Sequence, residues 1–553
     1  MWKNNNRRYM YLTAILIAAM IIGNFFWLIL DQYPIEGHDL LGVLPAAQLA
    51  RHFNGLENRQ PLFTSVWGSY CGNLHYPPLS FLILGGFYSV LGLQGQMSAM
   101  INSLYIILIL SCVYLLGKQL FDSKTGFFSA LILSFFPGFV ALSRDYWIEF
   151  GLIGYGCLNA YLLLKTDFFR NRKYSLMLGV SLALSFLHKQ EFILSFIGPL
   201  ILVCVYAGIP QSVLRLKKNR AITNFILALA LPVILTSFWW GPYFKGYVQR
   251  IFYVSSQIAE GIVHVKKQSF LEAYSYYYFM IGFLIGLPYL FLFTGSLLNS
   301  GFQLIRKDKN SFSLWFLLFW FVGSYVIISS LVTKAAPHIF VLLPIVALCI
   351  GAAFFFYPRG FFRIVCGGII IGMASYYYGY FPKKDLFILS YRQREKINRV
   401  LQQRNLLPIG GDNPWLNAGR SPRKERFEAA IMEVLAYIRN DKAPGEVRVL
   451  SLNRSAQLKN CIFSYYQLLY DESIVFFSYE YKHIHHLSEC DYLLLEKKTQ
   501  ESLESMRCSY GEGAGESEYF NEIIKDGLTD FILVATIPIQ DSKRTILIYK
   551  RKA

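Results

Sequence analysis

The sequence predicts an all-α membrane bundle of about 11 to 13 spans, followed by a small α/β domain. Three observations predict this fold class. Of the 553 residues, 54% are hydrophobic and only 16% are charged, whereas soluble domains have about 25% charged residues. Long apolar runs recur over residues 1–380. After Phe381 the chain becomes polar, with short β-like runs between helical patterns. This composition excludes a single soluble enzyme and a disordered chain.

The first apolar run follows a short basic segment at the N-terminus. Residues 9–30 form a run of 22 mostly apolar residues, and a helix of about 20 such residues crosses the hydrocarbon core of a bilayer. The run is longer than the apolar core of a signal peptide, and no cleavage pattern of small residues follows it. We therefore expect a retained first span.

Eleven further apolar runs follow. They centre on residues 79–93, 98–117, 126–142, 147–164, 175–188, 192–208, 222–242, 274–298, 312–332, 337–357 and 362–380. The run 79–93 is the weakest candidate span, because it is short, begins after Pro77-Pro78 and contains Gly85-Gly86. The sequence therefore predicts twelve spans, or eleven if this run does not cross the membrane.

Lys and Arg are unevenly distributed over the loops. The short loops on one side carry only Arg144, Lys189 and Lys334. The loops on the other side carry 18 Lys and Arg in total, in segments 1–8, 118–125, 165–174, 209–221, 303–311 and 357–363. Cytoplasmic loops are the ones enriched in Lys and Arg. This predicts a multi-pass protein of the cell (inner) membrane with a cytoplasmic N-terminus, and it explains the net charge of +18 without a nucleic-acid partner.

The remaining segments are predicted to lie outside the cytoplasm. They are the long loop 31–77, the aromatic-rich loop 243–273, and the domain 381–553 that follows the membrane domain 1–380. The C-terminal domain is predicted to contain a helix over 427–439, with strands over 447–452, 474–479 and 492–496 and a closing hairpin over 531–537 and 545–549.

Four polar clusters lie on the predicted external face. The first is Glu36-Gly37-His38-Asp39, at the start of the long loop. Its carboxylates are suited to accepting a proton from an acceptor hydroxyl. Alternatively, Asp39 only caps the amphipathic helix expected over 40–53. The second cluster is His75-Tyr76-Pro77-Pro78, where the prolines impose an extended entry into the next segment. This extended entry either places His75 beside the first cluster, or it is only a stiff re-entry of the chain into the membrane with an aromatic anchor.

The third and fourth clusters supply cations. Arg144 lies in the segment 143–149, which also contains Glu149. A guanidinium is well suited to binding phosphate, although an interfacial Arg–Asp pair would look the same. The fourth cluster combines His188-Lys189 with Lys334 and His338. Single lysines at span ends are common, so the informative feature is the set of isolated cations on one face, which an anionic ligand would require.

The order of these motifs resembles the GT-C membrane glycosyltransferases, in particular the bacterial protein O-mannosyltransferases and lipid A aminoarabinose transferases. In order, the motifs are an acidic motif after the first span, His75-x-Pro77-Pro78-Leu79, Ser143-Arg144, and the segments FLHKQEF (186–192) and KAAPHIFVLLPIVAL (334–348). The resemblance covers about residues 1–380, and the C-terminal domain is similar to the external domain of many members. It implies a polyprenyl-phosphate sugar as donor, the bilayer as environment, and an external acceptor that is a lipid, a glycan or a protein.

The resemblance also implies roles for individual residues. Asp39 matches the catalytic aspartate, but Leu40 stands where the family has a glutamate, so Glu36 shares the catalytic assignment. No cofactor is required in this group, and a divalent metal held by Glu36, His38, Asp39 and His75 remains an open alternative. The donor-phosphate residues are Arg144, Lys189, Lys334 and His338, and the substrate-binding residues are His38, His75, Tyr76, Glu149 and His188.

Two other functions fit a polytopic membrane protein. A lipid or polysaccharide transporter would need internal repeats and charges near the middle of spans, and the sequence shows neither. A saccharide polymerase or ligase would use a lipid-diphosphate donor, and only the identity of the donor would separate it from the glycosyltransferase.

Overall fold

The computed structural model describes residues 2–30, 38–54, 77–92, 97–144, 146–208, 220–241, 270–305, 311–330, 336–356, 367, 427–441, 447–452, 474–477, 491–498, 531–538 and 544–552. They are mostly helical. The chain divides into two compact units: Met1–Phe26, Phe63–Ser80 and Ala99–Ser421 form the first, and Trp27–Leu62, Phe81–Ser98 and Pro422–Ala553 form the second.

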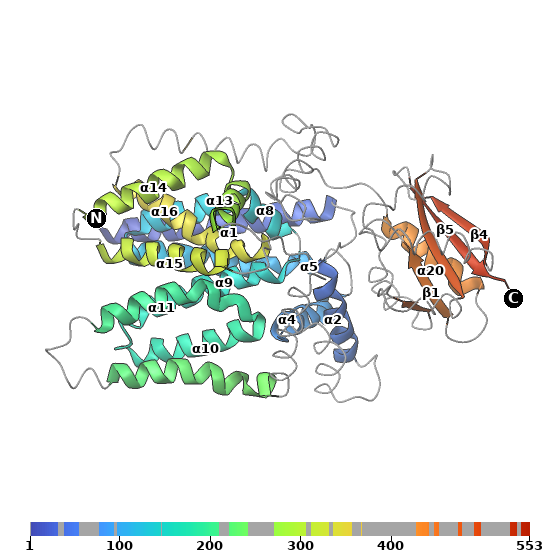
Figure 1. Ribbon diagram of the computed structural model, residues 1–553, viewed down its shortest axis with the longest axis horizontal. Coiled ribbons are helices and arrows are strands. Elements are labelled where there is room, and N and C mark those ends of the chain that lie inside the picture. Colours follow the sequence, from blue (N-terminus) through green and yellow to red (C-terminus); the bar gives the residue numbers. More distant parts are fainter. Residues whose placement is uncertain are drawn as a thin grey trace. The chain divides into compact units, whose positions relative to one another are not determined.

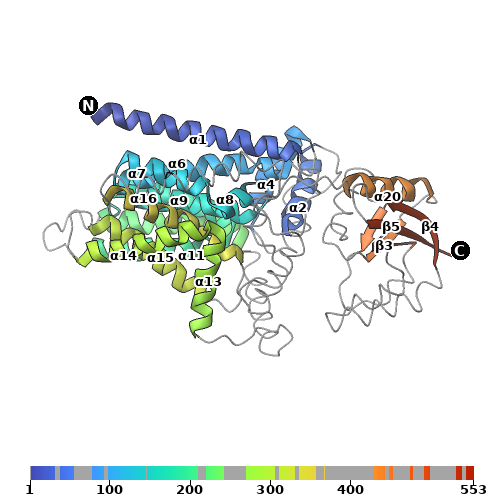
Figure 2. The same cartoon turned by 90° about the horizontal axis from the view of Figure 1, so that it is seen from above.

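The first unit is a bundle of apolar helices that lie side by side (Figures 1 and 2). It contains α1 (Trp2–Leu30) up to Phe26 and α5 (Met97–Met100) from Ala99. Its other segments are α6 (Asn102–Leu120), α7 (Ser123–Ser134), α8 (Pro137–Arg144), α9 (Ile148–Lys165), α10 (Arg172–His188), η2 (Gln190–Phe192), α11 (Ile193–Gly208), the helix 220–241, α13 (Phe270–Ile285), α14 (Leu287–Ile305), α15 (Ser311–Ser330), η3 (Ala336–Leu342) and α16 (Leu343–Phe356).

Several of these helices are long and apolar enough to cross a bilayer. Among the described residues there are four: Asn6–Ile29, Ser98–Leu120, Arg220–Gly241 and Phe312–Ser330. The pair α7 and α8 forms a fifth if its two parts are one span bent by 67°. The chain is thus a multi-pass membrane protein. The full count of 11 to 13 spans stays a prediction, because segment 362–380 lies almost entirely outside the described residues.

Two predicted spans are broken in the structure. Residues 126–142 were expected to form one helix, but α7 ends at Ser134 and α8 begins at Pro137. Proline lacks an N–H and is favoured in the first turn of a helix, so it begins a new helix here. Residues 274–298 are divided between α13 and α14 at Gly286, whose φ of +85° only glycine adopts easily.

Small residues bring the helix backbones close together. A Cβ added to Gly126 of α7 would overlap the carbonyl oxygen of Tyr114 in α6, and one added to Gly198 of α11 would overlap the carbonyl oxygen of Phe319 in α15. Helices in membranes pack tightly where small residues line the contact. These glycines therefore set the spacing of two helix pairs.

We expect Gly126→Ala to destabilise the bundle by about 1–3 kcal/mol, because the added methyl group must push α6 and α7 apart. Gly295→Ala in α14 is the matched control, since a Cβ added there would have no atom within 4 Å. Alanine is a better helix former than glycine by about 0.5–1 kcal/mol, so the control should not lose stability. Thermal unfolding of both variants in detergent is the measurement, and equal melting temperatures would contradict the packing argument.

A buried polar trio connects α9 and α10. The Asn159 side-chain amide donates to Ser185 Oγ at 2.8 Å, and its Oδ1 accepts a hydrogen bond from Ser181 Oγ at 2.6 Å. All three residues are at most 3% exposed. Each side-chain polar group of the trio thus finds a partner inside the protein rather than facing lipid.

The second unit contains two helices from the N-terminal part of the chain. They are α2 (His38–Phe53) and α4 (Leu79–Leu91). They contact each other at Gly85, where an added Cβ would lie 2.9 Å from Leu49 Cβ. The helix α2 occupies the place of the expected amphipathic helix 40–53.

The C-terminal part of the second unit has a five-stranded sheet in the order β2-β1-β3-β5-β4. Its elements are α20 (Phe427–Asp441), β1 (Val447–Leu452), β2 (Ile474–Phe477), β3 (Tyr492–Lys498), β4 (Phe531–Pro538) and β5 (Arg544–Arg551). The first three strands pair in parallel, and β5 pairs antiparallel with β3 and β4. The pair β4–β5 is the expected closing hairpin. The helix α20 contacts β4, and the Tyr437 hydroxyl donates to the Val534 carbonyl.

Candidate active site

The predicted site residues divide into described and undescribed groups. Glu36, His75, Tyr76 and Lys334 lie outside the described residues. The backbones of His38 and Asp39 form the first two residues of α2, and their side chains are not described. Since the helix begins at His38, Asp39 is its second residue and not the capping residue before the helix, as the alternative assumed. The catalytic roles of Asp39 and Glu36 therefore stay predictions.

The structure brings Glu149 and Lys189 together, although 40 residues separate them in sequence. Glu149 is in the first turn of α9, and Lys189 directly follows α10. The helices are antiparallel neighbours joined by the short connection 166–171, so these two ends meet. Lys189 Nζ lies 2.5 Å from Glu149 Oε1 and 3.5 Å from Glu191 Oε2, and its side chain is only 5% exposed. The lysine charge is thus held by two carboxylates at one end of the bundle.

Burial affects the second of these carboxylates. Burial raises the pKa of Glu191, and the neighbouring Lys189 ammonium partly opposes that rise. Desolvation disfavours the ionised form of a carboxyl group, while a nearby cation favours it. The distances of 2.5 Å to Glu149 and 3.5 Å to Glu191 make Glu149 the closer partner of Lys189.

His188 fixes the two helix ends in place. It is fully buried, and its Nε2 lies 2.8 Å from the Ile148 carbonyl oxygen. The ring packs against Tyr105 and Tyr155, at centroid distances of 5.7 and 5.1 Å. A Cβ on Gly151 would lie 2.5 Å from His188 Nε2, so only glycine leaves room for the ring. His188 thus acts on the site by positioning Glu149 against Lys189, and its predicted contact with substrate stays a prediction.

Arg144 lies at the C-terminal end of α8 and is only 6% exposed. Its Nε donates to Asn24 Oδ1 of α1 at 3.4 Å, and the Asn24 amide donates to Ser143 Oγ at 2.8 Å. From α6, the Asn102 amide donates to the Leu142 carbonyl at 3.0 Å. Two helices therefore hold the end of α8 through side-chain amides. The sequence analysis missed Asn24, whose signal is a lone amide inside an otherwise apolar run.

The 3-10 helix η3, which carries the partly exposed His338, packs against α9. The contact includes the Trp147 and Phe340 rings, edge to face at 6.1 Å. His338 thus belongs to a segment next to the helix that carries Glu149. Among the described residues, no group of three His, Cys, Asp or Glu residues could hold a metal ion. The possible metal ligands Glu36, His38, Asp39 and His75 stay predictions, because none of their side chains is described.

Comparisons with known proteins match the part of the chain that contains the candidate site. Residues 75–240, which include Arg144, Glu149 and Lys189, match the family model for dolichyl-phosphate-mannose-protein mannosyltransferases. In fold, the chain is similar to ArnT, the lipid A aminoarabinose transferase, from Cupriavidus metallidurans bound to undecaprenyl phosphate. The TM-score is 0.56 at 12% identity, over 97% of both chains. The chain has a GT-C fold. The resemblance predicted from the motif order is confirmed.

Two further structures align with this chain. The apo state of the same ArnT aligns with a TM-score of 0.56 at 12% identity, over 98% of this chain and 97% of that one. The oligosaccharyltransferase of Archaeoglobus fulgidus aligns more loosely, with a TM-score of 0.49 at 10% identity over 98% of this chain and 74% of that one. A search of curated protein sequences gave no significant match.

Proposed function

We propose that the protein is a membrane glycosyltransferase that moves a sugar from a polyprenyl-phosphate donor to an acceptor outside the cytoplasm. One observation carries the proposal. Two buried cations, Arg144 and Lys189, lie within the segment that matches the mannosyltransferase model. The fold around them is that of ArnT, whose structure contains undecaprenyl phosphate.

The reaction would be a direct displacement at the anomeric carbon. The acceptor oxygen forms a bond to that carbon as the bond between the carbon and the phosphate oxygen breaks. The carboxylate of Asp39 takes the hydroxyl proton. The electron pair of the broken bond leaves with the polyprenyl phosphate, so negative charge grows on the phosphate in the transition state. Cations fixed in a water-poor site stabilise such charge strongly.

The two cations would contribute differently. Arg144 offers a planar fork with several N–H donors, which suits bidentate phosphate binding. Lys189 is already paired with Glu149 at 2.5 Å, so it would offer its remaining donors to the phosphate. His338 and Lys334 are proposed as further phosphate contacts, and His38, His75, Tyr76, Glu149 and His188 as residues around the substrate.

The test is transfer by purified protein in detergent. Incubation with a polyprenyl-phosphate hexose or aminopentose and candidate acceptors, followed by mass spectrometry, should show a glycosylated acceptor and free polyprenyl phosphate. Transfer only from a lipid-diphosphate sugar would assign the polymerase or ligase function. Movement of intact lipid across vesicles without bond formation would assign the transporter function.

We expect Arg144→Lys to lower donor-dependent turnover by about tenfold or more although it keeps the charge, because lysine cannot form the bidentate contact. Arg7→Lys, at an exposed position near the start of α1, is the matched control and should leave turnover unchanged. Initial rates at varied donor concentration are the measurement. Equal rates for wild type and Arg144→Lys would make Arg144 an ordinary interfacial cation.

The proposed orientation has its own test. The loop charges predict that Lys218 lies in the cytoplasm and Gly445 outside it. Reporter fusions at the two positions should therefore report opposite sides of the membrane. The same side for both would overturn the external placement of the C-terminal domain.

A further inference from the structure

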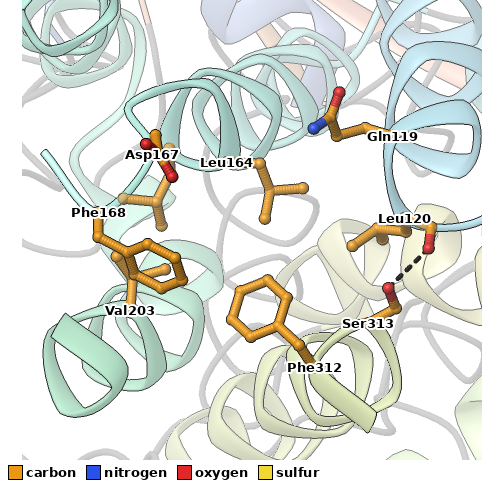
Figure 3. Close-up of a pocket in the computed structure, with 9 residues that line it drawn as sticks. Gln119, Leu120, Leu164, Asp167, Phe168, Val203, Phe312 and Ser313 are labelled. Carbon is orange, nitrogen blue, oxygen red and sulfur yellow. Dashed lines mark hydrogen bonds between the residues drawn. The ribbon is translucent and has the colours of Figure 1, made fainter. Parts of the chain in front are cut away.

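A cavity lies in the first unit, at the end of α9 opposite to Glu149, and Figure 3 shows the side chains that line it. The helix α9 has 18 residues, and a helix of that length measures about 27 Å. The cavity therefore has no part in the candidate active site. Its volume is about 420 Å³, and it is lined by Gln119, Leu120, Leu163, Leu164, Asp167, Phe168, Val203, Phe312 and Ser313.

The cavity has a polar mouth and an apolar interior. Asp167 and Gln119 are exposed, and Figure 3 shows them on either side of Leu164. The rings of Phe168 and Phe312 lie together on the opposite side, edge to face at 5.5 Å. The Ser313 hydroxyl is already used, since it donates to the Leu120 carbonyl at 2.6 Å. A ligand that fits must therefore be amphipathic.

A left-handed turn places Asp167 and Phe168 at this cavity. Asp167, Phe168 and Phe169 have φ values of +48°, +55° and +63°, and each such non-glycine residue costs about 1–2 kcal/mol. The turn is held by Phe169, which is only 3% exposed and packs on Phe225 at 5.0 Å. The Phe169 carbonyl also accepts a hydrogen bond from the Asn224 amide at 2.8 Å. Residues in such sparsely populated backbone conformations cluster at active sites, ligand clamps and switch regions.

Basic residues lie close to Asp167 in the sequence, and one of them reaches the rim of the cavity. Lys165 Nζ donates to Gln119 Oε1 at 2.9 Å, so the ammonium lies at the rim. Arg170 and Arg172 follow the turn and are exposed. Basic pockets between helices on the cytoplasmic side of membrane proteins bind phospholipid headgroups. The carboxylate of Asp167 adds a requirement that a purely anionic headgroup does not meet, namely a cationic group beside the phosphate.

We propose that this cavity binds a phospholipid whose headgroup carries both a phosphate and a primary ammonium, as in phosphatidylethanolamine. The ammonium contacts Asp167, the phosphate contacts Lys165 and Arg170, and the upper part of one acyl chain lies against Leu164, Phe168 and Phe312. The volume suits a headgroup and the start of one chain, with the remainder of the lipid in the bilayer. This site is separate from the proposed glycosyl transfer and does not depend on it.

The test is native mass spectrometry of the full-length protein in detergent, titrated separately with phosphatidylethanolamine, phosphatidylglycerol and phosphatidylcholine of equal chain length. We expect phosphatidylethanolamine to bind about tenfold more tightly than the other two, since a charge-assisted hydrogen bond to a carboxylate is worth about that factor. Equal binding of the three lipids, or a preference for phosphatidylglycerol, would overturn the proposal.

Asp167→Asn is the decisive variant, because asparagine tolerates left-handed backbone and so keeps the turn. It should abolish the preference for phosphatidylethanolamine and should not weaken phosphatidylglycerol binding, because it removes a negative charge beside the lipid phosphate. Asp122→Asn is the matched control at the same end of the bundle. Asp122 caps α7 by accepting from the Thr125 N–H at 2.7 Å, and asparagine caps equally well. A preference that survives in Asp167→Asn, or that is lost equally in Asp122→Asn, would refute the assignment to Asp167.

Discussion

Asp39→Asn is expected to lower turnover by about 10²–10⁴-fold, the usual contribution of a positioned general base, without changing the fold. Asparagine is nearly the same size as aspartate and keeps its hydrogen-bonding oxygen, but it cannot accept the acceptor's proton. If Asp39 serves only the start of α2, the change removes at most a charge near the helix N-terminus, worth about 0.3–1 kcal/mol. Such a loss would appear in stability and not in turnover.

Initial rates and thermal unfolding of Asp39→Asn separate the two roles. Asp122→Asn is a suitable control here as well, since it removes a carboxylate from the start of α7 while preserving the cap. Near-normal turnover in Asp39→Asn would reject it as the base. Glu36, the other carboxylate of the motif, would then be tested by the same substitution to glutamine.

Lys189→Met is expected to have a large effect on both stability and donor use. The change leaves Glu149 without its 2.5 Å partner at a position where the lysine side chain is 5% exposed. Breaking a buried ion pair from one side typically costs about 3–5 kcal/mol, because an uncompensated charge remains. We therefore expect a clear drop in melting temperature, accompanied by weaker use of the donor.

The double variant Lys189→Met/Glu149→Gln distinguishes structure from donor binding. Removing both charges avoids the unpaired carboxylate, so most of the stability should return. Donor use should stay low if Lys189 also contacts the phosphate. If turnover recovers together with stability, Lys189 is a structural cation, and the phosphate contacts are to be sought at Arg144 and His338. Double-mutant cycles measure such coupling directly.

The helices were largely predictable because apolar runs of span length have few alternatives in a membrane protein. The runs at 98–117 and 312–332 correspond to α6 and α15 within a few residues. The break at Gly286 was not predicted, because one glycine within an apolar run does not distinguish a continuous helix from a broken one. The bend before Pro137 had a signal in the sequence, namely the proline itself. The prediction of one span over 126–142 followed the apolar composition of the run instead.

The site was predictable in its composition and not in its contacts. Sequence analysis placed Arg144, Glu149 and Lys189 on the same face of the bundle, since all three lie at the ends of apolar runs. The pairing of Lys189 with Glu149 depends on how α9 and α10 pack, which loop charges do not specify. The burial of His188 under Tyr105 and Tyr155 likewise needs three helices to be in place.

The hydrogen-bonded trio of Asn159, Ser181 and Ser185 has a consequence for biogenesis. A lone asparagine amide entering lipid on α9 would face hydrocarbon without partners, a costly state for a polar group. Its partners lie on the next helix, only six residues of connection away (166–171). The two segments should therefore leave the insertion machinery together as a helical hairpin. While the ribosome is still synthesising the connection, α9 should stay at the translocon, and it should leave only when α10 has been made.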